Sequence, residues 1–309
     1  MPQTAKHIPV MLNEVLQALN VQTGGVYVDA TFGFGGYSKG ILQSADCSVI
    51  AIDRDPTVCK RADEFKQQYQ SKFDFKNAPF STMDHLVRSE VDGIVFDLGV
   101  SSMQLDDAAR GFSFSKTAAL DMRMSCEGLS AYDIVNTYSA EDIADILYLY
   151  GEEKKSRQIA QRIVEKRLIK PIETTTELAD IVHSVFPKKI GNTNSATRTF
   201  QALRIAVNNE LDELQTALRQ AAYLLKPEGR LVVVDFHSLE DRIVKTFFKE
   251  NSNKKEHVSR YGTSAPCDSK LFSYVSKILL PSADEVFSNP RARSAKMRFA
   301  VKNKGVKND

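Results

Sequence analysis

The sequence predicts an α/β fold: a doubly wound, mostly parallel sheet into which a helical domain is inserted. Two observations predict the sheet. Short apolar segments typical of buried strands alternate with helix-like segments, and a glycine-rich turn follows the first strand. A third observation predicts the insertion, because more than 130 residues separate Asp97, which ends one strand, from Leu231, which begins the next convincing one.

The first hundred residues give the elements of the sheet in regular order. A short amphipathic helix begins near Leu12, because apolar residues recur at helical spacing as far as Leu19. Further helices are expected from the residues after Gly36 to about Ser44 and from Pro56 to about Gln70. The expected strands are 26–30, 49–53, 73–76 and 94–97.

The inserted helical domain is predicted to span residues 106–214, so that residues 1–105 and 215–309 form one discontinuous sheet domain. The helices expected in and just after the insertion are 140–150, 153–168, 175–186 and a long one at 197–225. After a turn at 226–229, the chain is predicted to form a strand at 231–234, a helix at 239–249, a polar surface loop at 251–269, and strands at 272–279 and 295–301.

Composition excludes several classes of protein. Of the 309 residues 42% are hydrophobic and 26% charged, as in soluble globular proteins, and there is no run of 18 apolar residues to span a membrane. The four cysteines have neither the spacing nor the histidine partners of a zinc site: Cys47, Cys59, Cys126 and Cys267. Because the N-terminus also lacks an apolar signal core, we expect a cytoplasmic protein with no metal and no membrane partner.

The net charge of +2 conceals an uneven distribution along the chain. Residues 1–149 carry 12 basic and 20 acidic side chains, whereas residues 254–309 carry 12 and 5. Residues 150–210 have a net charge of +4 and residues 211–253 one of −1. The basic segments are either a solvated surface or a surface for a polyanion.

The glycine-rich turn after the first strand predicts a nucleoside-cofactor site. Gly33, Gly35 and Gly36 allow a tight turn and the close approach of a ligand to the free N–H groups of the following helix. Asp53 ends the next strand, where a carboxylate can accept hydrogen bonds from both ribose hydroxyls. Asp29 either faces a cationic group of the ligand or caps the helix. Since Ser38 stands where the dinucleotide pattern needs glycine, a cofactor without a pyrophosphate, such as S-adenosylmethionine, is favoured.

A second polar segment, residues 97–106, follows the fourth strand. It reaches the carboxyl edge of the predicted sheet, where ligands bind in such folds. Asp97 is a candidate to anchor a substrate donor, and Ser101, Ser102 and Gln104 supply further polar groups. The alternative is an ordinary polar loop.

Over nearly its whole length, the chain resembles the bacterial small-subunit (16S) ribosomal RNA cytosine N4-methyltransferases. The resemblance rests on long blocks in one order, among them His7-Ile8-Pro9-Val10-Met11, Thr31-Phe32-Gly33-Phe34-Gly35-Gly36, Ala51-Ile52-Asp53-Arg54-Asp55-Pro56, Asp97-Leu98-Gly99-Val100-Ser101-Ser102, Arg110-Gly111-Phe112-Ser113-Phe114, Leu120-Asp121-Met122-Arg123-Met124, Ala196-Thr197-Arg198-Thr199-Phe200-Gln201, Phe236-His237-Ser238-Leu239-Glu240-Asp241-Arg242 and Asn289-Pro290-Arg291-Ala292-Arg293-Ser294. It implies a class I methyltransferase fold, S-adenosyl-L-methionine as cofactor, and methylation of a cytidine near the decoding centre.

The resemblance also implies which residues hold the cofactor: Gly35, Gly36, Tyr37, Asp53, Phe80, Asp97 and Gln104. Periodicity alone would assign Phe80 to the core. The chain departs from the family at three places. Tyr37 stands where histidine is frequent, Ala118-Ala119 where Gly-Pro is usual, and Asp235 where serine is more usual.

The chemistry of the N4 amine defines what the catalytic groups must do. Its lone pair is delocalised into the ring, so catalysis requires in-line positioning and a hydrogen-bond acceptor for the amine. Our hypothesis is that Asp97, or a nearby backbone carbonyl, orients it. A stacking aromatic is expected from Phe112, Phe114 or Phe236. His237 is either a substrate contact and proton acceptor or a structural histidine.

Basic residues of the insertion and of the C-terminal segment are the candidate RNA contacts, because such side chains bind phosphates without reading sequence. The principal candidates are Arg198, Arg204, Arg291, Arg293, Lys296 and Arg298. Further cations that extend these segments are Arg157, Arg162, Lys166, Arg167, Lys302, Lys304 and Lys307. The expected partner is the small ribosomal subunit or its 16S rRNA.

Two other functions stay open at the level of sequence. The glycine turn with Asp53 also suits a nucleotide-dependent oxidoreductase, although Ser38 and the lack of hydride-transfer residues disfavour it. A non-catalytic RNA-binding protein on the same fold is disfavoured by the intact cofactor residues. The sequence leaves open whether the chain forms a homodimer.

Overall fold

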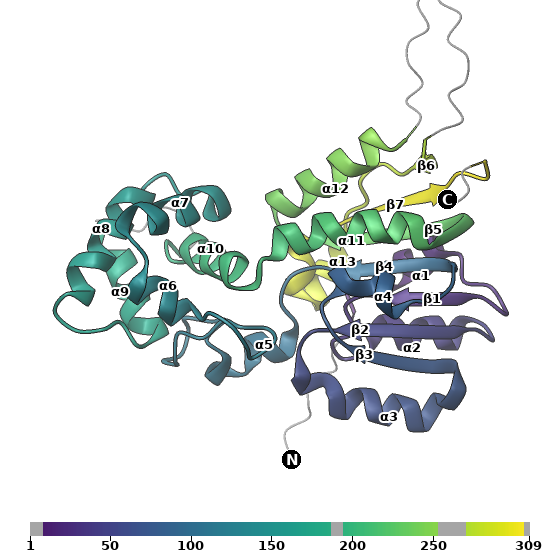
Figure 1. Cartoon of the computed structure of the whole chain (residues 1–309), viewed down its shortest axis with the longest axis horizontal. Helices are drawn as coiled ribbons and strands as arrows, with labels where there is room; N and C mark the ends of the chain where they lie inside the picture. Colours follow the sequence, from purple (N-terminus) through teal and green to yellow (C-terminus); the bar gives the residue numbers. More distant parts are fainter. Residues whose placement is uncertain (1–8, 187–193, 253–269, 306–309) are drawn as a thin grey trace, which may run out of the picture. The chain divides into compact units, whose positions relative to one another are not determined.

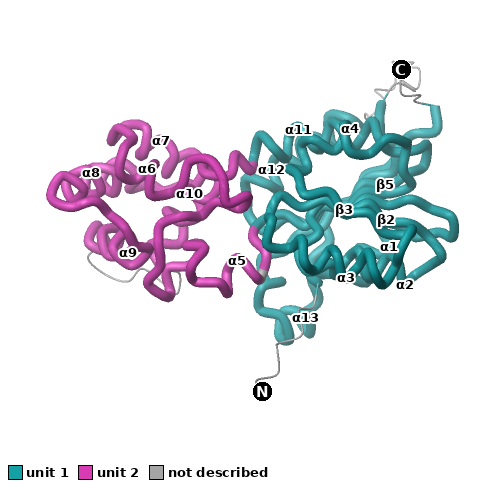
Figure 2. The backbone as a smooth tube through the Cα atoms, turned by 60° about the horizontal axis from the view of Figure 1, so that its bottom comes forward, with its two compact units in different colours: residues 1–99, 211–309 teal, residues 100–210 magenta. Residues whose placement is uncertain are grey.

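The computed structural model describes residues 9–186, 194–252 and 270–305. The chain divides into two compact units (Figure 2): Met1–Gly99 together with Leu211–Asp309, called here the sheet unit, and Val100–Glu210, called the helical unit. The sequence analysis placed these boundaries at residues 106 and 214.

In the described residues the sheet unit contains one seven-stranded sheet (Figure 1), with strand order β3-β2-β1-β4-β5-β7-β6. The strands are β1 (Val26–Asp29), β2 (Ser48–Asp53), β3 (Phe73–Asn77), β4 (Val91–Asp97), β5 (Leu225–Asp235), β6 (Phe272–Val275) and β7 (Lys296–Lys302). The strands β1 to β5 pair with one another in parallel, whereas β7 runs antiparallel to both β5 and β6.

The order of the strands makes the sheet doubly wound. From β1 the chain moves outward to β2 and β3, then returns to β4 on the other side of β1. The carboxyl ends of β1 and β4 therefore flank the point where the winding reverses, which is where such sheets bind ligands. The predicted class I methyltransferase fold is confirmed.

Helices cover both faces of this sheet, with α1, α2 and α3 on one side and α4 and α11 on the other (Figure 2). The helices that accompany the sheet are α1 (Leu12–Leu19), α2 (Gly36–Ser44), α3 (Cys59–Tyr69), α4 (Met83–Leu86), α11 (Glu210–Leu224), α12 (Ser238–Glu250) and α13 (Ala283–Ser288). Alternating strand residues such as Ile94 and Phe96 pack against Leu218 of α11 and Phe248 of α12 in one core.

The helical unit has a core of its own. Its helices are α5 (Ser102–Asp106), α6 (Ala131–Thr137), α7 (Ala140–Gly151), α8 (Ser156–Arg167), α9 (Thr175–Ser184) and α10 (Thr197–Asn208). Leu147, Ile163, Leu178 and Leu203 are fully buried together. Hydroxyl caps begin four of the helices: Ser101, Ser130, Ser139 and Thr174 accept from backbone N–H groups of the first turn. The Ala118-Ala119 segment, where the family usually has Gly-Pro, lies beside residues 174–175. Ala119 forms an isolated β-bridge with Thr174, and the Ala118 carbonyl accepts a hydrogen bond from Thr175 N.

Short 3-10 helices complete the described elements: Pro56–Val58, Gln70–Lys72, Phe80–Thr82, Ala108–Arg110 and Pro290–Ser294.

The structure differs from the sequence analysis at two connections. The long helix predicted at 197–225 is two helices, because Asn209 has a φ of 51° and ends α10. Asparagine tolerates this left-handed conformation better than most residues. The turn at 226–229 lies inside β5 as a bulge, since the pairing with β4 moves from Val91–Leu225 to Gly93–Arg230.

Some predictions fall on residues that the structure does not describe. Most of the polar loop predicted at 251–269, Cys267 and Lys307 lie outside the described residues. Among the described helices, none combines the length and the apolar character needed to cross a membrane.

Lys302 was predicted to extend a basic surface, but the structure buries it. Its side chain is 1% exposed, and Nζ donates to the carbonyls of Tyr223 at 3.2 Å and Leu225 at 2.8 Å. Burial lowers the pKa of this ammonium group. The cation therefore joins β7 to the end of α11 and is unavailable to a polyanion.

We expect Lys302→Met to destabilise the protein by about 2–4 kcal/mol, because two buried carbonyls lose their donor. Lys304→Met is the matched control: Lys304 is exposed and pairs with Glu228 at 3.1 Å, so its loss should cost less than about 0.5 kcal/mol. Urea unfolding of both variants measures the difference, and equal stabilities would contradict the role given to Lys302.

Candidate cofactor site and active site

Asp29 fixes the start of the glycine turn. Its carboxylate is fully buried at the end of β1 and accepts from Ser38 N at 3.0 Å, Ser38 Oγ at 2.6 Å and Thr31 N at 3.3 Å. Burial raises the pKa of Asp29, and these hydrogen bonds oppose the rise. Of its two predicted roles, the structure gives Asp29 that of a cap on α2.

The three glycines are required by the shape of the turn. Gly35 is the N-cap of α2 with a φ of 77°, and a Cβ there would lie 2.5 Å from the Phe65 ring. A Cβ on Gly36 would lie 2.2 Å from Pro9 Cγ. Gly33 has a φ of 50°. Side chains at these positions would displace the backbone that a ligand approaches.

Asp53 holds the turn from the other side. At the end of β2 its Oδ2 accepts from Gly33 N at 2.7 Å and its Oδ1 from Asp55 N at 2.9 Å. Burial raises its pKa to about 6, although the two N–H donors act in the opposite direction. The side chain is still partly exposed, so its remaining lone pairs can accept hydrogen bonds from ligand hydroxyls.

The side chain of Tyr37 turns into the protein. It is 3% exposed, and its hydroxyl donates to the Val10 carbonyl at 2.5 Å. Burial raises the pKa of the phenol well above its usual value. Tyr37 therefore ties α2 to the segment before α1, and only its backbone is available to a ligand in the turn.

Phe80 follows β3 and begins a 3-10 helix. Its ring is partly buried and meets Phe96 of β4 edge to face, with centroids 5.6 Å apart. This contact with the core fixes the orientation of Phe80, while its exposed part is available to an aromatic ligand.

Asp97 ends β4 beside the end of β1. Its backbone N–H donates to Thr31 Oγ1 at 2.7 Å, which links the two loops at the reversal of the sheet. Burial, assisted by the charges of Asp29 and Glu240, raises the pKa of its carboxyl to about 8. Among the described residues, its buried Oδ1 has no hydrogen-bond partner. A buried acceptor without a partner is a candidate to meet a ligand.

Sequence analysis did not single out Thr31, although it stands within a quoted motif. The available signal was a hydroxyl residue directly before the glycine turn, two positions after a strand-end carboxylate. Only the pairing of β1 with β4 reveals that it contacts Asp97.

Asp235 ends β5, the neighbour of β4, and is the second carboxyl without partners. It is fully buried, and neither oxygen has a hydrogen-bond partner in the described part of the chain. Burial and the charges of Asp241 and Glu240 raise its pKa to about 8, against the opposing charge of Lys296. The serine more usual at this position would avoid this desolvated carboxyl.

His237 caps helix α12. Its Nδ1 accepts from Glu240 N at 3.4 Å, while Glu240 Oε2 accepts from the N–H groups of Phe236 and His237 at 3.0 and 3.3 Å. Its Nε2 lies 3.2 Å from Glu240 Oε1. This reciprocal arrangement is a capping box, so the structural role predicted as an alternative is the one seen.

Phe236 is the stacking candidate within the sheet unit. A Cβ on Gly99 would lie 3.8 Å from its ring, and Gly99 has a φ of 90° just after Asp97. Phe112 and Phe114 belong to the helical unit, where Phe112 is buried and Phe114 packs on Phe200 at 4.8 Å.

Gln104 also belongs to the helical unit. It forms a capping box with Ser101: its Oε1 accepts from Ser101 N at 2.9 Å and its own N–H donates to Ser101 Oγ at 3.2 Å. The side chain is 5% exposed. Within its own unit Gln104 therefore fixes the start of α5.

At least three of the six principal RNA-contact candidates form ion pairs within the protein. Lys296 and Arg298 both contact Asp241, at 3.1 and 2.9 Å, and Arg204 forms two hydrogen bonds of 2.8 Å with Glu210. Arg167 likewise donates to two backbone carbonyls. Arg198, Arg291 and Arg293 are exposed.

Sequence comparison assigns the chain to a family of methylases. The model of the MraW methylase family matches residues 4–303. A Rickettsia bellii protein named "Ribosomal RNA small subunit methyltransferase H" is 52% identical over 300 residues, which is 96% of this chain and 98% of the relative. A Rickettsia felis protein of the same name is 52% identical over 306 residues, with 98% and 99% covered. The crystal structure of an rRNA methylase from Streptococcus thermophilus aligns over 98% of this chain and 99% of that one, at 10% identity and a TM-score of 0.41.

The doubly wound sheet, with its glycine turn and strand-end carboxylates, defines an S-adenosylmethionine-dependent methyltransferase of class I. The chain belongs to the MraW methylase family. The predicted cofactor, S-adenosyl-L-methionine, is thereby confirmed.

We expect Asp53→Ala to weaken binding of the product S-adenosylhomocysteine about 30- to 150-fold, because hydrogen bonds from ribose hydroxyls to a carboxylate are lost. Asp74→Ala on the adjacent strand is the control, since Asp74 is exposed and pairs with Lys76. Isothermal titration calorimetry measures both. Wild-type affinity for Asp53→Ala would remove Asp53 from the cofactor site.

Asp235 predicts a pH dependence of stability. Its folded-state pKa of about 8 exceeds the ordinary aspartate value of 3.8, so the folded state retains a proton that the unfolded chain has lost. Stability is thus lost as pH rises from about 4 to about 8. We expect the free energy of unfolding of Asp235→Ser to exceed that of the wild type by about 2 kcal/mol at pH 8 and to equal it at pH 4. Denaturant unfolding at both values tests this, and a gain independent of pH would contradict it.

Proposed function

We propose that this methyltransferase methylates the exocyclic N4 amine of a cytidine in small-subunit ribosomal RNA, near the decoding centre. The observation that carries the proposal is the identity of 52% across almost the full length to proteins named ribosomal RNA small subunit methyltransferase H. The strand-end residues supply the chemistry that such a reaction needs.

The residues at the carboxyl ends of β2, β3 and β4 have side chains suited to the cofactor. Asp53 offers a partly exposed carboxylate, Phe80 a partly exposed ring, and Asp97 an Oδ1 without a partner among the described residues. When bound, S-adenosylmethionine supplies an electrophilic methyl group on a sulfonium. We infer that Asp53 binds the ribose and Phe80 contacts the adenine, with the turn at 33–37 contributing backbone donors.

Asp97 has the properties of a group that orients the amine. With a pKa of about 8 its carboxyl is largely protonated at neutral pH, and a cationic ligand nearby favours its ionised form. The carboxylate then accepts a hydrogen bond from the N4 amine and directs the nitrogen lone pair toward the methyl group. Transfer would form the N–CH3 bond as the methyl–sulfur bond breaks and leaves a neutral thioether; the nitrogen would become more acidic, and Asp97 would take its proton.

Phe236 is the residue we assign to stacking on the cytosine. Its ring lies beside Gly99, two residues after Asp97, whereas Phe112 and Phe114 pack within the helical unit. A stacked base presents its exocyclic amine at the edge of the ring, as an in-line transfer requires. His237 and Glu240 then act as positioning residues, because their capping box fixes the backbone of Phe236.

The activity is tested by methyl transfer from labelled S-adenosylmethionine to small ribosomal subunits, followed by nucleoside analysis. We expect labelled N4-methylcytidine, and a decrease of about 100-fold in kcat for Asp97→Asn with S-adenosylhomocysteine affinity within a few-fold of wild type. Label in another nucleoside would overturn the N4 assignment. Binding of subunits without transfer would favour a non-catalytic RNA-binding protein, and full turnover by Asp97→Asn would remove Asp97 from the mechanism.

A further inference from the structure

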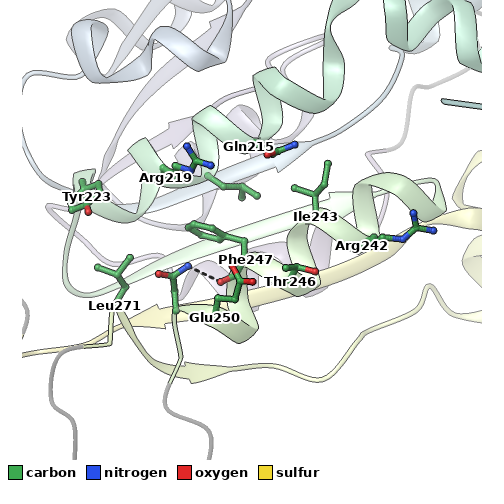
Figure 3. A pocket seen from close by; sticks show the side chains of 11 residues that line it. Gln215, Arg219, Tyr223, Arg242, Ile243, Thr246, Phe247, Glu250 and Leu271 are labelled. Carbon is green, nitrogen blue, oxygen red and sulfur yellow. Dashed lines mark hydrogen bonds between the residues drawn. The ribbon is translucent and has the colours of Figure 1, made fainter. Parts of the chain in front are cut away.

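A groove between α11 and α12 of the sheet unit is used by nothing described so far (Figure 3). It has a volume of about 510 Å³. Gln215, Arg219 and Tyr223 line it from α11 at intervals of four residues, so they share one face of that helix. Arg242, Thr246 and Phe247 line it from α12.

The groove combines an apolar floor with exposed polar groups. Leu218 is fully buried beneath it, and Phe247 is partly buried against Phe248 and Phe272, with ring centroids 6.0 Å apart in both pairs. Tyr223 is 57% exposed, and it lines the groove beside this apolar floor. Its hydroxyl and ring are thus presented to solvent at one end of the groove.

Positive charge predominates around the groove. Arg219 and Arg242 line it and are exposed, and Lys245 and Lys249 continue the exposed face of α12 from Arg242 at intervals of three and four residues. Glu250 is the one carboxylate that lines the groove in the described residues. The acidic residues nearer the start of α12 do not line the groove: Glu240 is buried in the capping box, and Asp241 is paired with Lys296 and Arg298.

We propose that the groove between α11 and α12 binds a single-stranded segment of the RNA substrate. Arg219 and Arg242 contact successive phosphates, while the exposed ring of Tyr223 stacks on a base. Gln215 and Thr246 also line the groove and offer hydrogen bonds to sugar hydroxyls. The identity of the RNA rests on the proposed function, whereas the chemistry of the groove does not.

An acidic protein segment is the competing occupant, since it would also contact the arginines. The exposed tyrosine and the apolar floor favour RNA, because every base offers a face for stacking and an acidic side chain offers none. The two occupants differ in how they respond to removal of the aromatic ring alone.

The test uses the full chain and a fluorescein-labelled, single-stranded RNA of 20 nucleotides, with binding followed by anisotropy across a range of KCl concentrations. We expect the double variant Arg219→Ala, Arg242→Ala to bind at least about 5-fold more weakly and to reduce the slope of log K against log salt by about 1.4, since single strands lose about 0.7 per phosphate contact. Lys66→Ala combined with Arg88→Ala is the matched control, because it removes two exposed cations elsewhere on the sheet unit.

The aromatic contribution is tested separately. Tyr223→Ala should weaken RNA binding about 5-fold or more and Tyr223→Phe should restore it, because stacking needs the ring and not the hydroxyl. Affinity for S-adenosylhomocysteine should be unchanged in every variant, which shows that the sheet unit is folded.

Wild-type affinity and slope in the double arginine variant would overturn the proposal, as would an equal loss in the control. Loss of binding to a poly-glutamate peptide in the arginine variant, with RNA binding retained, would assign the groove to an acidic protein. If the wild type binds the RNA through the groove but transfers no methyl group to small subunits, the proposed function fails and the groove remains an RNA site.

Discussion

The glycine turn is fixed by two carboxylates, and the cofactor site depends on them. Asp53 accepts from Gly33 at the start of the turn, and Asp29 accepts from Ser38 just after it. Parallel pairing of β1 with β2 places the two carboxylates at the same edge of the sheet, with Asp29 opposite Ala51. The backbone between Gly33 and Ser38 is therefore set before any ligand arrives, which reduces the ordering cost of binding.

The same edge carries two carboxyls with buried oxygens that have no hydrogen-bond partner among the described residues. Asp97 and Asp235 end adjacent strands, and both have pKa values near 8 because they are desolvated. Their effects on the protein differ. Asp97 borders the site where a cation and an amine are proposed to bind, so its cost in stability is matched by a function. Asp235 is fully enclosed, and the serine usual in its place would need no such compensation.

Patterns of apolar residues were sufficient to predict the class of the fold, because strand and helix periodicities and turn residues are local signals. Side-chain partners were not predictable in the same way. Tyr37 was expected in the cofactor turn, yet its hydroxyl reaches Val10, 27 residues away. His237 contacts a residue three positions along its own helix, and a helix start with Glu at that spacing is a signal the sequence already contained. The apolar pattern continues through Asn209, yet the helix ends there. Its left-handed backbone conformation ends the helix, and the spacing of apolar residues does not report backbone conformation.

Charge counted along a chain differs from charge available to a partner. The basic excess of residues 254–309 includes Lys296, Arg298 and Lys302, and the structure uses all three internally. Residues 211–253 have a net charge of −1, yet they contain the cationic groove between α11 and α12. Their acidic members include Asp235 and Glu240, which are buried, and Asp241, which is paired. The charge that a surface offers to a partner depends on which charged side chains are buried or paired. A segment that is acidic by count can therefore still present cations at its surface.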